Sequence, residues 1–130
     1  MALPVFRNPP SVHATGGRYS HIAEVTGAQR WVHLAGQVGK RPDDTIPTDV
    51  GEQVEVALAN ILALLAEVGM GPANIVKMVT YLVDAADIPA YREARLKALP
   101  AGISPATTLL VISGLATPEY KVEIEVVACD

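Results

Sequence analysis

The sequence predicts an α+β domain in which one mixed β-sheet carries two helices on one face. Its 130 residues suffice for one hydrophobic core and are too few for two ordinary domains. Residues 50–68 repeat apolar side chains at helical spacing, whereas residues 74–84 and 120–128 are rich in β-branched and apolar residues. Because helices alternate with strands and further strands lie at both ends, we expect the order ββαβαββ in a single domain, residues 1–130.

The N-terminal part of the chain predicts an arm followed by a hairpin. Residues 1–17 contain prolines and glycines without apolar periodicity, which is typical of an arm or loop. Residues 18–25 and 30–38 have the composition of strands, and Gly27 lies in the turn between them. We therefore expect these two strands to pair with each other.

The clearest pattern in the chain belongs to the first helix. Apolar residues recur from Val50 to Val68 at i, i+3 and i+4 spacing, which predicts a long helix with one apolar face on the sheet. Asp49 followed by Glu52 resembles a capping box at the start of this helix. Gly69 is suited to end it.

The second half of the chain alternates strands with a second helix. The apolar strand predicted over residues 74–84 is followed by a helix over residues 87–99, where Pro89 is tolerated in the first turn. Two more strands are predicted over residues 104–115 and 120–128. We expect these last two strands to form a hairpin at the C-terminal end.

Composition limits the classes of function. A net charge of −4 argues against nucleic acid as a partner, which would favour a basic face. The single cysteine, Cys129, cannot form an internal disulfide, which fits a reducing compartment. The first residues lack the apolar run of a signal peptide, and no run approaches the ~20 residues of a membrane span. We therefore expect a soluble cytoplasmic protein without nucleic-acid or membrane partners.

The sequence lacks the motifs of several common catalytic and metal sites. It contains no G-x-S-x-G elbow, no phosphate-binding P-loop and no H-E-x-x-H. His13, His21 and His33 match no ligand spacing, so half-buried strand histidines are favoured over a metal site. The pattern therefore favours no metal site.

Two carboxylates and three other polar residues leave alternatives open. Glu123 and Glu125 lie on one face of the last strand, about 7 Å apart. An exposed face makes this an ordinary amphipathic strand, which the pattern alone favours. If the face meets a pocket or another subunit, the carboxylates can bind a cation or position a water. Tyr19, Arg92 and Arg95 have no distinguishing context, since helix arginines are mostly solvated.

Several segments, taken in order, carry a family resemblance from about Tyr19 to Ala128. They are YSH, AGQVG, QVEVALANILALLAEVGM, NIVKMVTYLVDAADIPAYREAR and SPATTLLVISGLATPEYKVEIEVVA. The most specific is the small-residue strand entry followed by V-E-I-E-x-x-A. In this order and spacing the segments resemble the RidA/YjgF family, also called the Rid or endoribonuclease L-PSP family.

The resemblance implies both an assembly and an activity. It implies a chorismate-mutase-like subunit in a homotrimer, with strands around a central barrel and small-molecule sites in clefts between subunits. It also implies a hydrolase, a deaminase that converts reactive enamines or imines to carbonyl compounds and ammonia. The resemblance therefore implies neither a metal nor an organic cofactor, because the C=N carbon is already electrophilic.

Site residues follow from the same resemblance. Tyr19 matches the family's pocket tyrosine, Gly36 a backbone contact, and Glu123 the glutamate that positions water. Relatives hold a substrate carboxylate with an arginine directly after Pro-Ala, a position that Thr107 occupies here. A hydroxyl cannot replace that bidentate pair, whose charge-assisted hydrogen bonds contribute about 1.5–3 kcal/mol each. Arg92, on the second helix, is a candidate to supply the missing charge.

Our preferred interpretation is an enamine/imine deaminase of altered specificity. Glu123 is its expected catalytic residue, and Tyr19, Gly36, Thr107 and Arg92 are its expected substrate-binding residues. The pocket's ligand is alternatively neutral or cationic, with Thr107 as a hydroxyl donor and Glu123 as an anionic wall. A non-catalytic small-molecule-binding or regulatory trimer is the second interpretation. A ribonuclease or translation inhibitor is the least favoured, because the chain is acidic.

Overall fold

The computed structural model describes residues 2–130, which form a mixed sheet with two helices on one face. Its elements are β1 (Val5–Arg7), β2 (Ile22–Glu24), β3 (Trp31–His33), β4 (Gln37–Val38), α1 (Val50–Glu67), a 3-10 turn (Pro72–Asn74), β5 (Ile75–Leu82), a second 3-10 turn (Ala85–Asp87), α2 (Ile88–Ala98), β6 (Ala106–Val111) and β7 (Val122–Cys129).

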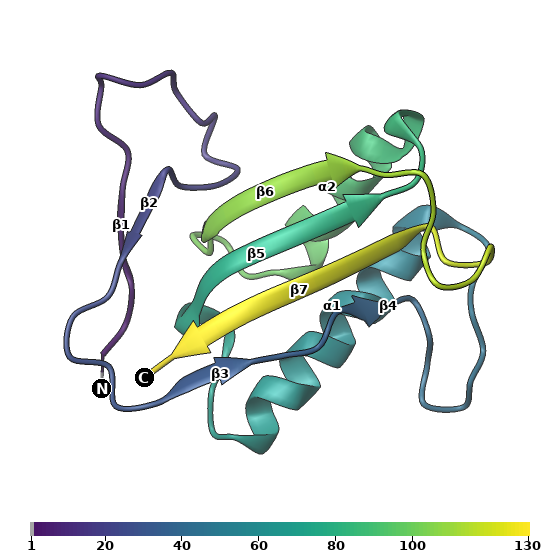
Figure 1. Ribbon diagram of the computed structural model, residues 1–130, viewed down its shortest axis with the longest axis horizontal. Coiled ribbons are helices and arrows are strands. Elements are labelled where there is room, and N and C mark those ends of the chain that lie inside the picture. The colour runs from purple at the N-terminus through teal and green to yellow at the C-terminus, as the bar shows by residue number, and fades with distance from the viewer. Residues whose placement is uncertain (1) are drawn as a thin grey trace.

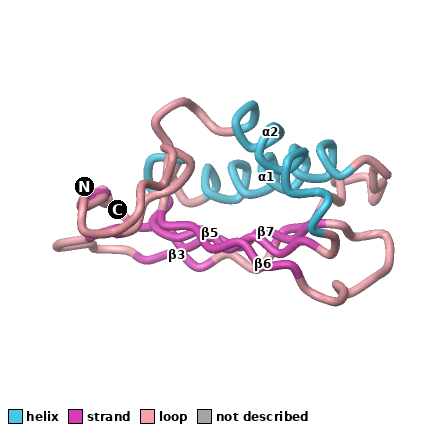
Figure 2. The backbone as a smooth tube through the Cα atoms, turned by 90° about the horizontal axis from the view of Figure 1, so that it is seen from above, coloured by secondary structure: helices cyan, strands magenta, loops and turns pink. Residues whose placement is uncertain are grey.

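The five-stranded sheet has the order β3-β7-β5-β6, and β4 also pairs with β7 (Figure 1). β5 runs antiparallel to β7 and parallel to β6, so the sheet is mixed. Figure 2 shows α1 and α2 together on the same side of this sheet. The predicted α+β class, with both helices on one face, is therefore confirmed.

α1 begins and ends at the residues that its capping signals predict. The Asp49 side chain accepts the amide of Glu52 at 2.9 Å, which pairs one of the free donors of the first turn. At the other end, Gly69 has a φ of +76°, and the amide of Met70 reaches the carbonyl of Leu65 at 2.9 Å. This pairing is a Schellman motif, which ends the helix.

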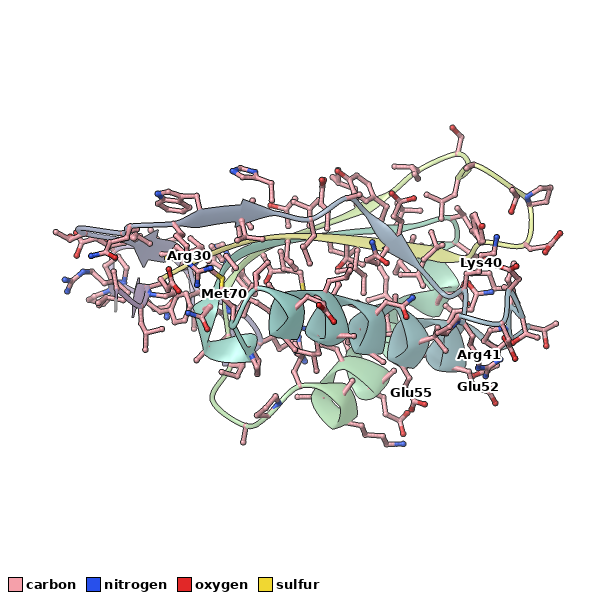
Figure 3. The ribbon with its side chains drawn as sticks, turned by 90° about the horizontal axis from the view of Figure 1, so that it is seen from below. Arg30, Lys40, Arg41, Glu52, Glu55 and Met70 are labelled. Atoms are coloured by element: carbon pink, nitrogen blue, oxygen red, sulfur yellow. The ribbon has the colours of Figure 1, made fainter. Side chains whose placement is uncertain are left out.

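A charged group also closes the C-terminal end of α1. Arg30 lies beside Met70 there, at the opposite end of the helix from Glu52 (Figure 3). Nη1 of Arg30 donates to the carbonyl of Val68 at 3.0 Å, and the guanidinium pairs with Asp130. The hydrogen bond from Arg30 holds the pKa of the Asp130 carboxyl below its ordinary value. A cation here complements the helix dipole.

Both predicted hairpins are wrong, although the strands exist. β2 pairs with β1, which lies in the segment 1–17 that we expected to be an arm or loop, while β3 pairs with β7. Gly27 turns the chain with a φ of +71°, but it connects strands of different sheets. β5 lies between β6 and β7, so those consecutive strands do not pair. The β5–α2–β6 segment is instead a crossover between parallel strands.

β7 separates an apolar face from a polar one, as its alternation predicts. Val122, Ile124 and Val126 are at most 2% exposed and belong to the core beneath the helices. Glu123 and Glu125 point to the other side of the sheet and are half-buried.

The sheet face opposite the helices, which we call the open face, carries Trp31, Tyr81, Leu110, Glu123 and Glu125. In the described part of the chain, no helix lies on it (Figure 2). Trp31 and Leu110 are 51% and 45% exposed. Trp31 lies on the edge strand β3 and Leu110 on the edge strand β6, so large apolar side chains are exposed at both edges of this face. Such exposure is typical of a surface that another molecule covers.

Gln53 is a buried polar residue that supports the fold. It is fully buried on α1, where its side-chain amide donates to the carbonyls of Pro47 and Glu119 at 2.8 and 2.9 Å. Its side-chain oxygen accepts the amide of Lys121 at 2.9 Å. One side chain therefore holds the two loops before α1 and before β7.

We expect Gln53→Leu to lower the free energy of unfolding by about 3 kcal/mol or more, because three backbone groups lose their partner. Urea denaturation measures this change. Gln29→Leu, on an exposed glutamine, is the matched control and should change stability by less than about 0.5 kcal/mol. Equal midpoints for the two variants would contradict the role of Gln53.

Candidate functional site

A cavity of about 510 Å³ lies between α2 and the first half of β6, and we call it the α2–β6 pocket. Its wall includes Tyr91, which is 2% exposed and whose hydroxyl lies 2.7 Å from the hydroxyl of Thr80. Leu99, Ile103 and Leu109 add apolar surface. The volume and mixed lining are those of a small-molecule site.

A short segment before β2 is fastened to the loop before β6, and this places Tyr19 in the pocket wall. Ser20 donates through its hydroxyl to the carbonyl of Ser104 at 2.7 Å, and its amide bonds to the carbonyl of Pro105 at 3.2 Å. The hydroxyl of Ser104 donates in return to the carbonyl of Gly17 at 3.0 Å. Residues 84 positions apart thus form one side of the pocket.

The charge of the pocket is positive. Arg18, Arg92 and Arg95 line it, and no carboxylate does so within residues 2–130. Arg92 is exposed, whereas Arg95 is half-buried and donates through Nη2 to the Thr107 hydroxyl at 3.3 Å. That hydroxyl donates its own proton to the carbonyl of Pro105 at 2.9 Å, which leaves its oxygen free to accept from Arg95.

Gly36 and Glu123 form a second group, away from the pocket. β4 lies against β7 in this region, with Val38 opposite Glu123. A Cβ atom on Gly36 would lie 2.8 Å from the carboxyl carbon of Glu123, too close for any real contact. The absence of a side chain at Gly36 therefore leaves the space in which the Glu123 carboxyl sits.

The neighbouring carboxylate, Glu125, has a partner within the sheet. The hydroxyl of Tyr81 donates to it across β5 and β7. This hydrogen bond, burial and the charges of Glu125 and Glu123 raise the pKa of Tyr81, so its phenol stays protonated. Glu125 is thereby engaged in holding Tyr81.

The structure brings together only some of the predicted site residues. Tyr19, Arg92 and Thr107 line the α2–β6 pocket. Thr107 pairs with Met78, a core residue beneath the helices, so its side chain lies on the helix face of the sheet. Glu123 pairs with Tyr81 on the open face, beside Gly36. One subunit therefore presents these residues on opposite faces of its sheet.

Arg95 is the pocket residue that sequence reasoning undervalued. Helix arginines are mostly solvated, yet Arg95 shares a helical stripe with the buried residues Tyr91 and Ala94. An arginine on a buried stripe is a usable signal, because its charged end must find polar partners. Arg18 gave no such signal.

The remaining histidine and membrane predictions concern features outside the pocket. His13 and His21 lie outside the strands, with ring centroids 4.9 Å apart, and His33 is on β3 but exposed. The prediction of half-buried strand histidines is therefore wrong. The described residues contain no cluster of three histidine, cysteine, aspartate or glutamate side chains suited to a metal ion. Neither helix in residues 2–130 has the length and apolar character required to cross a bilayer.

Comparison with known proteins identifies the family. The family model described as Endoribonuclease L-PSP matches residues 11–130. A RutC family protein of Haemophilus influenzae is 31% identical over 109 residues, which cover 84% of this chain and 90% of the relative.

Solved structures agree with this assignment. A protein of unknown function from Yersinia pestis, YyfB of the conserved Rid family, is 30% identical, with a TM-score of 0.87 over 98% of both chains. RidA from an Antarctic Psychrobacter shares the fold, with a TM-score of 0.72 at 24% identity over 100% of this chain and 99% of that one. With the fold, the motifs and the family model in agreement, this chain belongs to the Endoribonuclease L-PSP family, also known as RidA/YjgF.

Proposed function

We propose that this protein hydrolyses enamines or imines that carry a carboxylate, releasing a carbonyl compound and ammonia. The observation that carries the proposal is the charge of the α2–β6 pocket, where Arg18, Arg92 and Arg95 face no carboxylate among the described residues. Guanidinium groups in this arrangement attract an anion. A neutral or cationic ligand would leave their charge unbalanced.

Arg95 supplies the charge that relatives place at the position of Thr107. Its guanidinium already lies against the Thr107 hydroxyl, at 3.3 Å, and comes from α2 instead of β6. Thr107 orients the guanidinium through this bond, which leaves further N–H groups to hold a carboxylate in bidentate fashion. Arg92 reaches the same pocket from the preceding turn of α2, but its side chain is more exposed.

The proposed reaction needs positioning and acid–base help. An enamine first becomes the imine, by gaining a proton on carbon and losing one from nitrogen. Water then adds to the C=N carbon and gives one proton to a base, while the nitrogen gains a proton. The resulting carbinolamine expels ammonia as its hydroxyl gives up a proton, which leaves a C=O group. In this scheme Arg95 fixes the substrate carboxylate, and Glu123 takes the proton from water. The reaction needs no cofactor, because the imine carbon is electrophilic.

The same proposal includes a homotrimer. Glu123 and the α2–β6 pocket lie on opposite faces of one sheet, so the reaction requires the open face of a neighbouring subunit beside the pocket. The exposed Trp31 and Leu110 on the open face support such a contact, because aromatic and large apolar residues are enriched at interfaces. The family resemblance implies the same arrangement, with sites in clefts between subunits.

A non-catalytic, carboxylate-binding protein is the second candidate. The separation of Glu123 from the pocket within one subunit favours it. If neighbouring subunits do not bring the two together, the pocket retains its arginines and lacks the carboxylate that activates water.

Ammonia release from freshly generated 2-aminoacrylate distinguishes the two candidates. We expect the protein to accelerate this release over buffer, and to leave a neutral enamine of similar size unaffected, because only the former offers Arg95 a carboxylate. Failure to accelerate the release, together with measurable binding of pyruvate, would favour the binding protein. Equal acceleration of the neutral enamine would mean that the substrate does not need a carboxylate.

We expect Gly36→Ala to lower kcat by about a hundredfold, because a Cβ at this position displaces the Glu123 carboxyl and small displacements of a reacting group have effects of that size. Glu123 is a flexible side chain, so the fold should persist. Gly114→Ala is the matched control, since a Cβ there has no neighbour within 4 Å. An unchanged kcat in Gly36→Ala would mean that Glu123 does not take part in the reaction.

A further inference from the structure

Three aromatic rings form a cluster at the edge of the α2–β6 pocket. The reaction proposed above assigns this cluster no role. The ring of His21 meets His13 edge-on, with centroids 4.9 Å apart, and meets Tyr19 edge-on at 5.5 Å. Tyr19 belongs to the pocket wall. The cluster therefore joins a pocket residue to two histidines of the N-terminal segment.

Hydrogen bonds fix the geometry of this cluster. Nε2 of His21 donates to the carbonyl of His13 at 2.7 Å, since a carbonyl oxygen can only accept. The amide of His21 is held by the side chain of Asn8 at 2.8 Å. With its backbone held in this way, His13 places its own Nε2 3.2 Å from the hydroxyl of Tyr19.

The bond between His13 and Tyr19 contributes little to folding. His13 is an exposed side chain, and the backbone beside Tyr19 is already fastened through Ser20 to the loop before β6. Substitutions at such surface positions usually change stability by less than about 0.5 kcal/mol. A histidine and a phenol joined at a pocket wall, without need in the core, point to a role toward the ligand.

We propose that His13 is a positioning residue that orients the hydroxyl of Tyr19 toward a ligand in the α2–β6 pocket. A neutral imidazole with its proton on Nδ1 accepts the phenol proton, so the phenol oxygen turns a lone pair to the ligand. An imidazolium donates instead and frees the phenol O–H to donate. The titratable rings that face His13 are those of Tyr19 and His21, and Arg18 adjoins Tyr19 in the wall.

This role rests on the proposed function and adds a proton donor to it. In the imidazolium state, Tyr19 gives its proton to the substrate nitrogen, and the proton of His13 moves to the phenol oxygen. Tyr19 is then restored, His13 is neutral, and the amine can leave as ammonia. Glu123 takes a proton from the attacking water, which is the other reactant.

Nuclear magnetic resonance of ring-labelled histidine tests the bond itself. The chain has three histidines, so three imidazoles are to be distinguished, and His13→Gln assigns one of them. We expect Tyr19→Phe to shift the Nε2 resonance of His13 by several ppm and to leave that of His33 unchanged. A His13 resonance that is indifferent to Tyr19→Phe overturns the proposal, whatever the protein's activity.

A double-mutant cycle on ammonia release tests the role. We expect His13→Leu to lower kcat about tenfold with less than a twofold change in KM, and His13→Gln to restore only part of the loss, because its amide can orient the hydroxyl but has no proton to transfer. In the Tyr19→Phe background, His13→Leu should have no further effect, because it acts through the missing hydroxyl. Additive losses would overturn the proposal. Tyr120→Phe, a hydroxyl deletion outside the pocket, is the matched control.

The two readouts separate this inference from the proposed function. If the wild-type protein releases no ammonia, the deaminase proposal fails, and titration with pyruvate then replaces the kinetic cycle. A pyruvate-dependent shift of the His13 resonance that Tyr19→Phe abolishes supports the positioning role without catalysis. A bound pyruvate that leaves His13 unaffected overturns it.

Discussion

We expect Arg95→Met to lower kcat/KM for 2-aminoacrylate by about a hundredfold. The half-buried guanidinium of Arg95 lies against Thr107 in a pocket with no carboxylate among the described residues, so its free N–H groups are available to the substrate carboxylate. Two charge-assisted hydrogen bonds at about 1.5 kcal/mol each amount to about 3 kcal/mol, which is roughly a hundredfold in rate. Methionine fills comparable volume, so the pocket should keep its shape.

Three further variants make this result specific. Lys97→Met removes a charge of the same sign on α2, but Lys97 does not line the pocket and pairs with Glu93 at 3.4 Å. The kcat/KM of this variant should be unchanged. Arg95→Lys keeps the charge without the planar fork and should recover only part of the activity. Thr107→Arg, combined with Arg95→Met, should restore activity from β6. Full activity in Arg95→Met alone would mean that Arg95 does not bind the substrate.

Both helices and the longer strands followed from local patterns, because each pattern reports burial of one face. β1 did not, since it lies in the segment 1–17 that we expected to be an arm or loop. The repeat of apolar residues from Val50 to Val68 and the alternation in β7 both appear in the structure as predicted. Strand partners did not follow, because pairing is decided across the chain. β3 pairs with β7, with Trp31 opposite Cys129, and no local pattern in either strand predicts that pairing.

The site was only partly predictable, for a related reason. The resemblance pointed to Tyr19 and Thr107, which line one pocket, and to Gly36 and Glu123, which share another location. It did not indicate Arg95, whose guanidinium comes from α2 and not from the strand position of Thr107. The β5–β6 register places Thr107 on the helix face of the sheet, and only the three-dimensional structure shows that α2 brings the Arg95 guanidinium to it.

We expect Glu123→Gln to lower kcat about a thousandfold with little change in KM, because an amide cannot accept the proton of water and general base catalysis is worth about 10²–10⁴ in rate. Glu123 is half-buried on the open face, and glutamine has nearly its shape, so stability should be preserved. Glu125→Gln, where the carboxylate holds Tyr81, should have a much smaller effect. Comparable losses in both variants would mean that the open face needs negative charge in general and not a base at Glu123.

The separation of Glu123 from the α2–β6 pocket makes a test of the assembly possible. Arg95→Met and Glu123→Gln subunits can be co-expressed with different tags. If a site consists of Glu123 from one subunit and Arg95 from its neighbour, it is intact where Glu123 of an Arg95→Met subunit lies beside Arg95 of a Glu123→Gln subunit. Random mixing in a ring gives about one quarter of the wild-type activity from two variants that are nearly inactive alone. Co-expression of Arg95→Met with the Arg95→Met/Glu123→Gln double variant should recover nothing, because no subunit then carries Arg95. If purified mixed oligomers of the first pair are also inactive, Glu123 and Arg95 do not serve the same site across a subunit contact, and the carboxylate-binding role alone would explain the arginines of the pocket.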